Sequence, residues 1–229
     1  MFETFGGFMV YIALLLIIPL WAQSRVKNTY KKYSQVRSSS GMTGAQVARK
    51  ILDDNGLFDV KVEPVKGMLS DHYDPRSKTV RLSEQNYYGN SIAGAAVAAH
   101  EVGHAIQDEE EYVFLNFRHT LVPAANLGSN LSFVFILAGI FLSSMGMFLA
   151  GIIFMSFAVL FQLVTLPVEF DASNRAMSQI VSAGVIRNDE ERETKKVLNA
   201  AALTYVAAAL VALMELLRFV FLFLGMNDD

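Results

Sequence analysis

Apolar residues gather in long blocks along the chain, separated by two stretches of mixed polar and apolar sequence. Blocks at about 5–22 and 200–224 each suit one helix across a bilayer, which needs roughly 20 apolar residues. Residues 131–168 include no charged side chain, and this block is long enough for two short spans with a break near 143–146. The pattern therefore predicts four membrane-spanning helices, one in each outer block and a hairpin of two within 127–168.

The stretch at 23–126 has the mixed periodicity of a small α+β domain. A capping-box pattern at 43–46 precedes an apolar stripe at helical spacing and predicts a helix that Gly56 ends. Side chains alternate between apolar and polar at 60–63, which predicts a strand that Pro64 stops.

A hairpin and the helix after it complete this predicted domain. Residues 68–73 and 79–82 flank Asp74-Pro75-Arg76-Ser77, whose side chains favour a tight turn. Asn90 or Ser91 can cap the helix that follows. The domain is therefore expected to combine short strands with two helices.

The second polar stretch, at 169–199, is predicted to be helical. The first helix begins directly after Pro167, and Gly184 breaks it. A second helix begins at Asn188 or Asp189, with acidic residues in its first turns, and can continue straight into the last span.

Lysine and arginine residues predict the orientation in the membrane. Five follow the first span and none precedes it, and a second group lies between the third and fourth spans. Short loops rich in these cations stay in the cytoplasm, so both polar stretches are expected there and both chain ends outside. The two groups are Arg25, Lys27, Lys31, Lys32 and Arg37, and Arg175, Arg187, Arg192, Lys195 and Lys196.

Charge and composition exclude several classes of function. A formal net charge of -3 does not indicate nucleic-acid binding. The chain has no cysteine, which excludes disulfides and thiolate metal ligands. Any bound metal must therefore be held by histidine and carboxylate side chains.

Residues 100–104 read His-Glu-Val-Gly-His, and they lie in an alanine-rich run that suits a buried helix. Histidines four residues apart project from one helix face, so His100 and His104 can reach one metal ion. Glu101 would lie beside the open coordination position, where a water can be activated for hydrolysis. The motif predicts a zinc hydrolase, most simply a peptidase.

A zinc site of this kind needs a third protein ligand. The His-x-x-Gly-x-x-His spacing of one peptidase branch is absent after His104. Glu169, two residues beyond Pro167 at the cytoplasmic end of the third span, is the preferred candidate over Asp171. The small residues of 93–103 would let a second helix approach the metal helix closely.

The combination of His-Glu-Val-Gly-His, a membrane hairpin and Glu-Phe-Asp-Ala-Ser-Asn-Arg-Ala at 169–176 resembles the bacterial YugP-like membrane neutral zinc metallopeptidases. The resemblance covers nearly the whole chain, including 71–75, 80–83 and 203–205. More distantly, the chain is similar to the HtpX-like membrane peptidases.

The resemblance implies a gluzincin-type site in which His100, His104 and Glu169 bind zinc and Glu101 is the general base. It also implies that the strand near 79–83 could hold an extended substrate by edge pairing. The HtpX-like pattern places an aspartate four residues after the ligand glutamate. This chain has Ser173 there, with Asp171 at the second position instead.

The group that stabilises the oxyanion is less evident from the sequence. The candidates for this role, or for orienting a ligand histidine, are Asp171, Arg175, His72 and Tyr205. Each of the last three also has a structural explanation: an interfacial cation, a hairpin-surface residue and a membrane-interface anchor, respectively.

Glu215 and Arg218 lie three residues apart within the last span. Charges inside a membrane are costly unless paired, so they indicate a functional site by default. An ion pair that packs the helix bundle is the preferred explanation, and a role in partner binding stays open.

The fold predicted from the sequence is an α-rich membrane protein: a four-helix transmembrane bundle with a small zincin-like α+β cytoplasmic domain. The predicted function is a zinc endopeptidase of the bacterial cell membrane that acts on peptides or proteins, membrane proteins among them. A membrane partner or a homo-oligomer is compatible with the sequence. The alternative is a non-hydrolytic, zinc-stabilised membrane scaffold or partner-binding protein.

Overall fold

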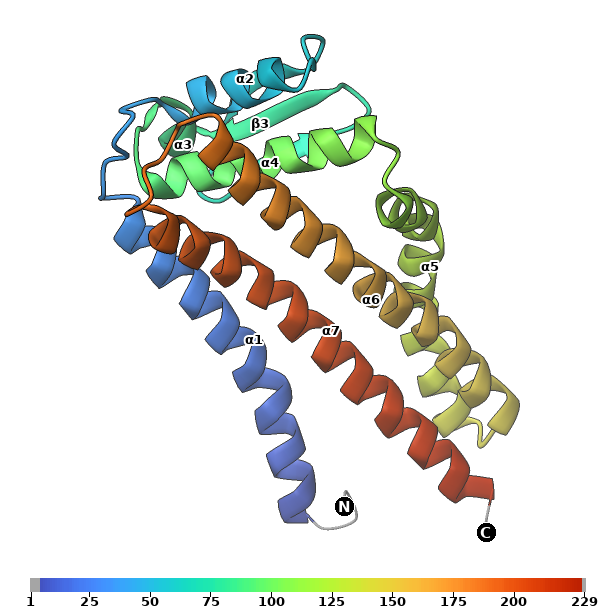
Figure 1. Ribbon diagram of the computed structural model, residues 1–229. Helices are drawn as coiled ribbons and strands as arrows, with labels where there is room; N and C mark the ends of the chain where they lie inside the picture. Colours follow the sequence, from blue (N-terminus) through green and yellow to red (C-terminus); the bar gives the residue numbers. More distant parts are fainter. Residues whose placement is uncertain (1–4, 228–229) are drawn as a thin grey trace. The chain divides into compact units, whose positions relative to one another are not determined.

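The computed structural model describes residues 5–227, and these form seven helices and three strands (Figure 1). They divide into two compact units. The mixed unit consists of Ala22–Tyr112 and Val168–Thr204. The helical unit consists of Val113–Pro167 with the described residues before Ala22 and after Thr204.

Four long helices confirm the predicted number of candidate membrane spans. Helices α1 (Phe5–Tyr33), α5 (Val113–Phe141), α6 (Met145–Ser182) and α7 (Glu191–Asn227) are each long and apolar enough to cross a bilayer. Residues 142–144 connect α5 to α6 and overlap the predicted break. Helix α7 begins close to the predicted start and runs through the last apolar block, as expected.

Helix α6 does not begin after Pro167, and that prediction was wrong. Pro167 lies inside a helix of 38 residues, which Figure 1 draws as one unbroken ribbon. A proline removes one backbone donor, but neighbouring groups in long apolar helices can compensate. As a result, one helix carries both the third apolar span and the candidate ligand Glu169.

Close backbone contact joins α5 and α6 within the helical unit. A Cβ added at Gly139 would lie 2.6 Å from the backbone nitrogen of Phe148, so only glycine fits there. The apolar side chains Ile136, Phe148 and Ile152 form a small buried cluster beside this contact.

Arg218 of α7 lies among aromatic rings of the helical unit. Its guanidinium carbon is 5.4 Å from the ring centre of Phe8, 5.2 Å from that of Tyr11 and 5.5 Å from that of Phe219. Cation–π contacts of this kind stabilise a charge in apolar surroundings. They tie α7 to α1, which agrees with a packing role for Arg218; the role of Glu215 stays a prediction.

A three-stranded sheet lies in the mixed unit, with the strand order β1-β3-β2. Strand β1 (Lys61–Val65) pairs parallel with β3 (Thr79–Ser83), and β2 (His72–Asp74) pairs antiparallel with β3. The predicted hairpin is therefore confirmed. Pro64 lies within β1 rather than ending it, because β1 is an edge strand and its outer side needs no ladder donor.

The central position of β3 overturns one expectation. One side of β3 is paired with β1 along its whole length, and the other side is paired with β2 at Thr79–Arg81. These pairings leave no continuous free edge along 79–83 for an extended substrate. The unpaired edges of this sheet belong to β1 and β2.

Helices α2 (Gly44–Asp54), α3 (Glu84–Tyr88) and α4 (Ile92–Glu109) complete the mixed unit. The predicted capping box is present at Thr43, and Ser91 caps α4 by accepting a hydrogen bond from the Gly94 N–H. A core of apolar side chains joins α2, α4 and β3 and holds α4 firmly. It includes Val47, Ile51, Leu52, Val80, Leu82 and Val102, all fully buried.

Candidate metal centre

His100 and His104 lie one turn apart on α4 and project from the same face. Their ring centres are 4.8 Å apart, with the planes almost perpendicular at 82°. Their side chains are only 14% and 13% exposed, respectively, so both rings are largely shielded from water.

Glu169 reaches both histidines from α6. Its Oε2 lies 3.3 Å from His100 Nε2 and 3.6 Å from His104 Nε2, and its side chain is 3% exposed. One ligand atom from each of these three residues lies within 4.8 Å of the other two. The structure thus gathers the two histidines and the carboxylate preferred from the sequence into one cluster.

Gly103 makes the approach of the two helices possible. A Cβ at this position would lie 2.6 Å from the carbonyl oxygen of Ala172 on α6. The small residues in this part of α4 therefore allow the close helix contact that the sequence predicted. The contact brings Glu169, three residues before Ala172, next to the histidines.

The chemistry of this donor set fits zinc. Two imidazole nitrogens and one carboxylate oxygen are a usual ligand combination for catalytic Zn²⁺, with a fourth position left for water or substrate. Hard cations such as Mg²⁺ prefer ligand sets built only from oxygen. His100, His104 and Glu169 could therefore hold a zinc ion through both Nε2 atoms and Oε2.

Glu101 follows the first histidine on α4 and is 8% exposed. Burial raises the pKa of its carboxyl group, although the neighbouring histidines act in the opposite direction. Burial lowers the pKa of His104, but the adjacent carboxylates of Glu169 and Glu101 raise it, and the net direction is upward. The cluster is thus strongly coupled electrostatically.

Gln107 contacts the cluster, although the sequence analysis did not identify it as a candidate. Its side-chain oxygen lies 3.0 Å from His104 Nδ1, and its side-chain nitrogen donates to Asp171 on α6. Asp171 also accepts a hydrogen bond from Arg175. The available signal was the spacing, because a residue three positions after His104 lies on the same helix face.

Ser173 occupies the position at which the HtpX-like pattern has an aspartate. Its hydroxyl oxygen lies 3.3 Å from His100 Nδ1. Asp171, at the second position after Glu169, reaches His104 through Gln107 instead. Because serine replaces the aspartate, His100 contacts the Ser173 hydroxyl, whereas His104 contacts the Gln107 amide.

The remaining candidates lie in other surroundings. Arg175 pairs with Glu110 and Asp171 and lies over the Tyr112 ring. His72 is exposed on β2, with its Nδ1 2.8 Å from the Ser70 carbonyl oxygen. Tyr205 belongs to the helical unit. The oxyanion role of these residues stays a prediction.

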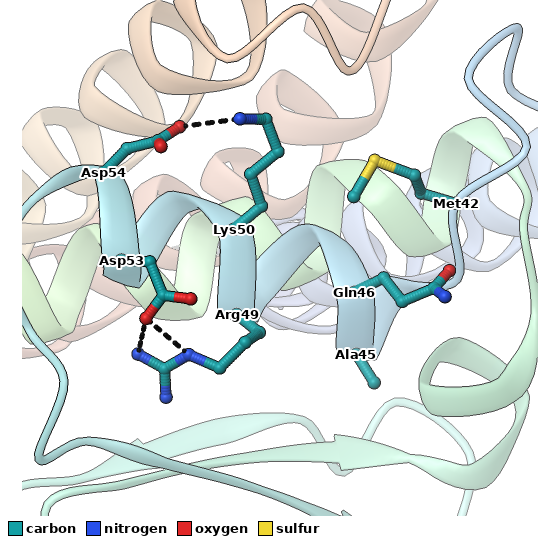
Figure 2. Close-up of a pocket in the computed structure, with 7 residues that line it drawn as sticks. All are labelled: Met42, Ala45, Gln46, Arg49, Lys50, Asp53 and Asp54. Carbon is teal, nitrogen blue, oxygen red and sulfur yellow. Dashed lines mark hydrogen bonds and ion pairs between the residues drawn. The ribbon is translucent and has the colours of Figure 1, made fainter.

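A shallow surface pocket over α2 offers no competing site. Figure 2 shows that its charged side chains pair with each other, Arg49 with Asp53 and Lys50 with Asp54. Arg49 also donates to the backbone oxygens of Leu57 and Val60. Such pairs are typical of a solvated helix face, and the pocket lining includes no residue of the metal cluster.

Comparison with known proteins decides the family. The sequence profile of the family described as "Putative neutral zinc metallopeptidase" matches residues 8–224. The chain belongs to this family. A relative in it, described as "Putative membrane protease YugP" of Bacillus subtilis (strain 168), is 57% identical over 212 residues, which cover 93% of this chain and 94% of the relative. No solved structure matches the chain.

Family membership agrees with what the structure contains. The matched region includes α4 with both histidines, the α5–α6 pair and Glu169. The relative is described as a membrane protein, in agreement with four helices long and apolar enough to span a bilayer.

Proposed function

We propose that this protein is a membrane-embedded zinc endopeptidase of the gluzincin type, with a zincin-like domain formed by the mixed unit. The observation that carries the proposal is the cluster of His100, His104 and Glu169, in which ligand atoms from two helices meet within 4.8 Å. Family membership supports a peptidase rather than another zinc-dependent reaction.

In this mechanism His100, His104 and Glu169 would hold the metal, and Glu101 would transfer the proton. When bound, zinc polarises the scissile carbonyl and makes a water acidic enough to attack it. Glu101 accepts the proton of the attacking water and then donates it to the leaving amine. Its buried position on α4 between the two histidines keeps competing water away from the carboxylate.

We further propose that the site faces the cytoplasm near the membrane surface. The lysine and arginine residues after the first span and between the third and fourth spans support this orientation. Glu169 follows the charge-free block by one residue. Membrane proteins, or peptides held near the lipid headgroups, are therefore the proposed substrates, and a membrane partner or a second copy of the chain could present them.

Purified full-length protein in detergent tests the proposal. It should cleave casein or a labelled peptide, lose this activity with a chelator and regain it with zinc. Glu101→Gln should keep stoichiometric zinc and lose roughly 10²–10⁴-fold in kcat, because general acid–base catalysis contributes that much. Glu109→Gln, on the exposed end of the same helix, is the matched control and should stay active.

The alternative, a zinc-stabilised scaffold, predicts the opposite results. Wild-type protein would then bind zinc through four protein ligands and cleave nothing. Full activity of Glu101→Gln would overturn the proton-transfer role while leaving the metal site intact.

A further inference from the structure

Gln107 is a buried polar side chain that contacts the metal cluster, and the mechanism above does not use it. It lies on α4, three residues after His104, and is fully buried. We propose that Gln107 is a positioning residue that holds His104 in the tautomer with Nε2 free to bind the metal. The inference rests on the proposed function, because it assumes that His104 binds zinc.

The orientation of the Gln107 amide follows from its partners. Its nitrogen lies 2.8 Å from the Val168 carbonyl oxygen and 2.8 Å from Asp171 Oδ2. Both of these groups are acceptors, so both amide hydrogens are donated. A flipped amide would place its oxygen against a carbonyl and a carboxylate, which is repulsive. The amide oxygen must therefore face His104.

The tautomer of His104 follows from that orientation. An amide oxygen can only accept, so the 3.0 Å contact between Gln107 Oε1 and His104 Nδ1 requires a hydrogen on Nδ1. In the neutral ring, Nε2 then carries the lone pair. This is the atom that lies 3.6 Å from Glu169 Oε2, inside the metal cluster.

An ion pair holds the outer end of this arrangement. Asp171 Oδ2 accepts from Arg175 Nε as well as from Gln107. Arg175 in turn pairs with Glu110 at the end of α4 and lies over the Tyr112 ring. The chain of contacts thus runs from α6 back to α4, and it fixes Asp171 where it can hold the Gln107 nitrogen.

Among residues 5–227, His100 has no corresponding amide partner at Nδ1. The contact of His100 Nδ1 is the Ser173 hydroxyl, at 3.3 Å. A hydroxyl can donate or accept, so it does not select between the two tautomers. The structure therefore assigns tautomer control to the His104 side of the cluster.

Zinc affinity of the full-length protein in detergent, measured by competition with a chromogenic chelator, tests this role. Gln107→Met keeps the length of the side chain and removes its hydrogen bonds. It should weaken zinc binding roughly 10–100-fold, as loss of an orienting partner of a ligand histidine typically does. Gln179→Met is the control: it breaks an amide pair with Asn55 in the same unit and should leave zinc affinity unchanged.

A double-variant cycle separates positioning from general structural support. If Asp171 acts on His104 through Gln107, Asp171→Leu, which removes the acceptor of the Gln107 N–H, should weaken zinc binding in the wild-type background. It should add little in the Gln107→Met background. The visible spectrum of the Co²⁺-loaded protein should change in the same two variants and not in Gln179→Met.

Each result decides a different claim. Wild-type protein that binds no zinc would overturn the proposed function itself. Wild-type protein that binds zinc, together with Gln107→Met within about twofold of its affinity, would overturn only the positioning role. Fully additive losses of zinc affinity in the double variant would also overturn the positioning role. Asp171→Leu alone supplies the answer if Gln107→Met does not fold, because leucine removes the acceptor of the Gln107 N–H and unchanged affinity there contradicts the relay.

Discussion

The two halves of helix α6 make close contacts of the same kind with different consequences. Residues 145–167 belong to the helical unit, where Gly139 of α5 brings two backbones together among apolar side chains. Residues 168–182 belong to the mixed unit, where Gly103 of α4 lies against Ala172. This contact also encloses two polar side chains, Glu169 and Gln107, and both are buried.

The difference shows that close helix packing alone does not make a site. A buried polar group costs free energy unless it has a partner, and the apolar half of α6 has few such groups to satisfy. In the other half, the carboxylate of Glu169 lies against both histidines, and Gln107 uses both of its amide hydrogens. Close packing brings the donors together, and the identity of the donors determines the chemistry.

Removing the Glu169 carboxylate should give the largest change in zinc affinity. Glu169→Ala should weaken zinc binding roughly 10²–10³-fold, because about 10–16 kcal/mol for a structural zinc site with four protein ligands comes to about 2.5–4 kcal/mol for each ligand. Glu190→Ala is the matched control. That glutamate is also buried in the mixed unit, but it accepts hydrogen bonds from the backbone N–H groups of Ser39 and Arg187. Glu190→Ala should lower the Tm and leave zinc affinity intact. An equal loss of zinc affinity in both variants would contradict the ligand role of Glu169.

A methyl group placed in each glycine contact should give an intermediate effect and separate the two halves. Gly103→Ala should weaken zinc binding roughly tenfold or more, since overpacking costs about 1–3 kcal/mol and pushes α6 away from the histidines. Gly139→Ala should lower the Tm by a similar strain without changing zinc affinity. Chelator competition and thermal unfolding on the same preparations measure both quantities. Parallel changes in zinc affinity would show that the halves are not independent.

Loss of the Ser173 hydroxyl should give the smallest effect. Its contact with His100 is long, at 3.3 Å, and a typical hydrogen bond contributes about 0.5–1.5 kcal/mol. Ser173→Ala should therefore weaken zinc binding less than about tenfold, and less than Gln107→Met does. The opposite ranking in a zinc titration would place tautomer control on His100.

Local patterns in the sequence predicted much of this molecule. Helical spacing places His100 and His104 on one face whatever surrounds them, and the long apolar blocks fix the number of candidate spans. Glu169 could be preferred because it directly follows the third apolar block, on the side of the membrane predicted for both histidines. The capping box at Thr43 needs only its neighbours to form.

The parts that failed depend on contacts between distant residues. The strand prediction stopped at Pro64 because the pattern does not show that β1 is an edge strand. The expected substrate edge at 79–83 was wrong because the parallel pairing with β1 joins residues far apart in sequence. The role of Gln107 depends on Val168 and Asp171, which lie more than sixty positions away along the chain. No spacing rule connects them.

The division of the metal cluster between α4 and α6 has a consequence for biosynthesis. His100 and His104 are synthesised before α5, whereas Glu169 follows only after α5 and the apolar part of α6. A nascent chain therefore carries two of the three donors until synthesis has passed both of these apolar segments. Because translation proceeds from the N-terminus, the three candidate ligands cannot meet before this late stage of synthesis. The first candidate span, α1, is made long before them, so completion of the cluster follows membrane anchoring rather than preceding it.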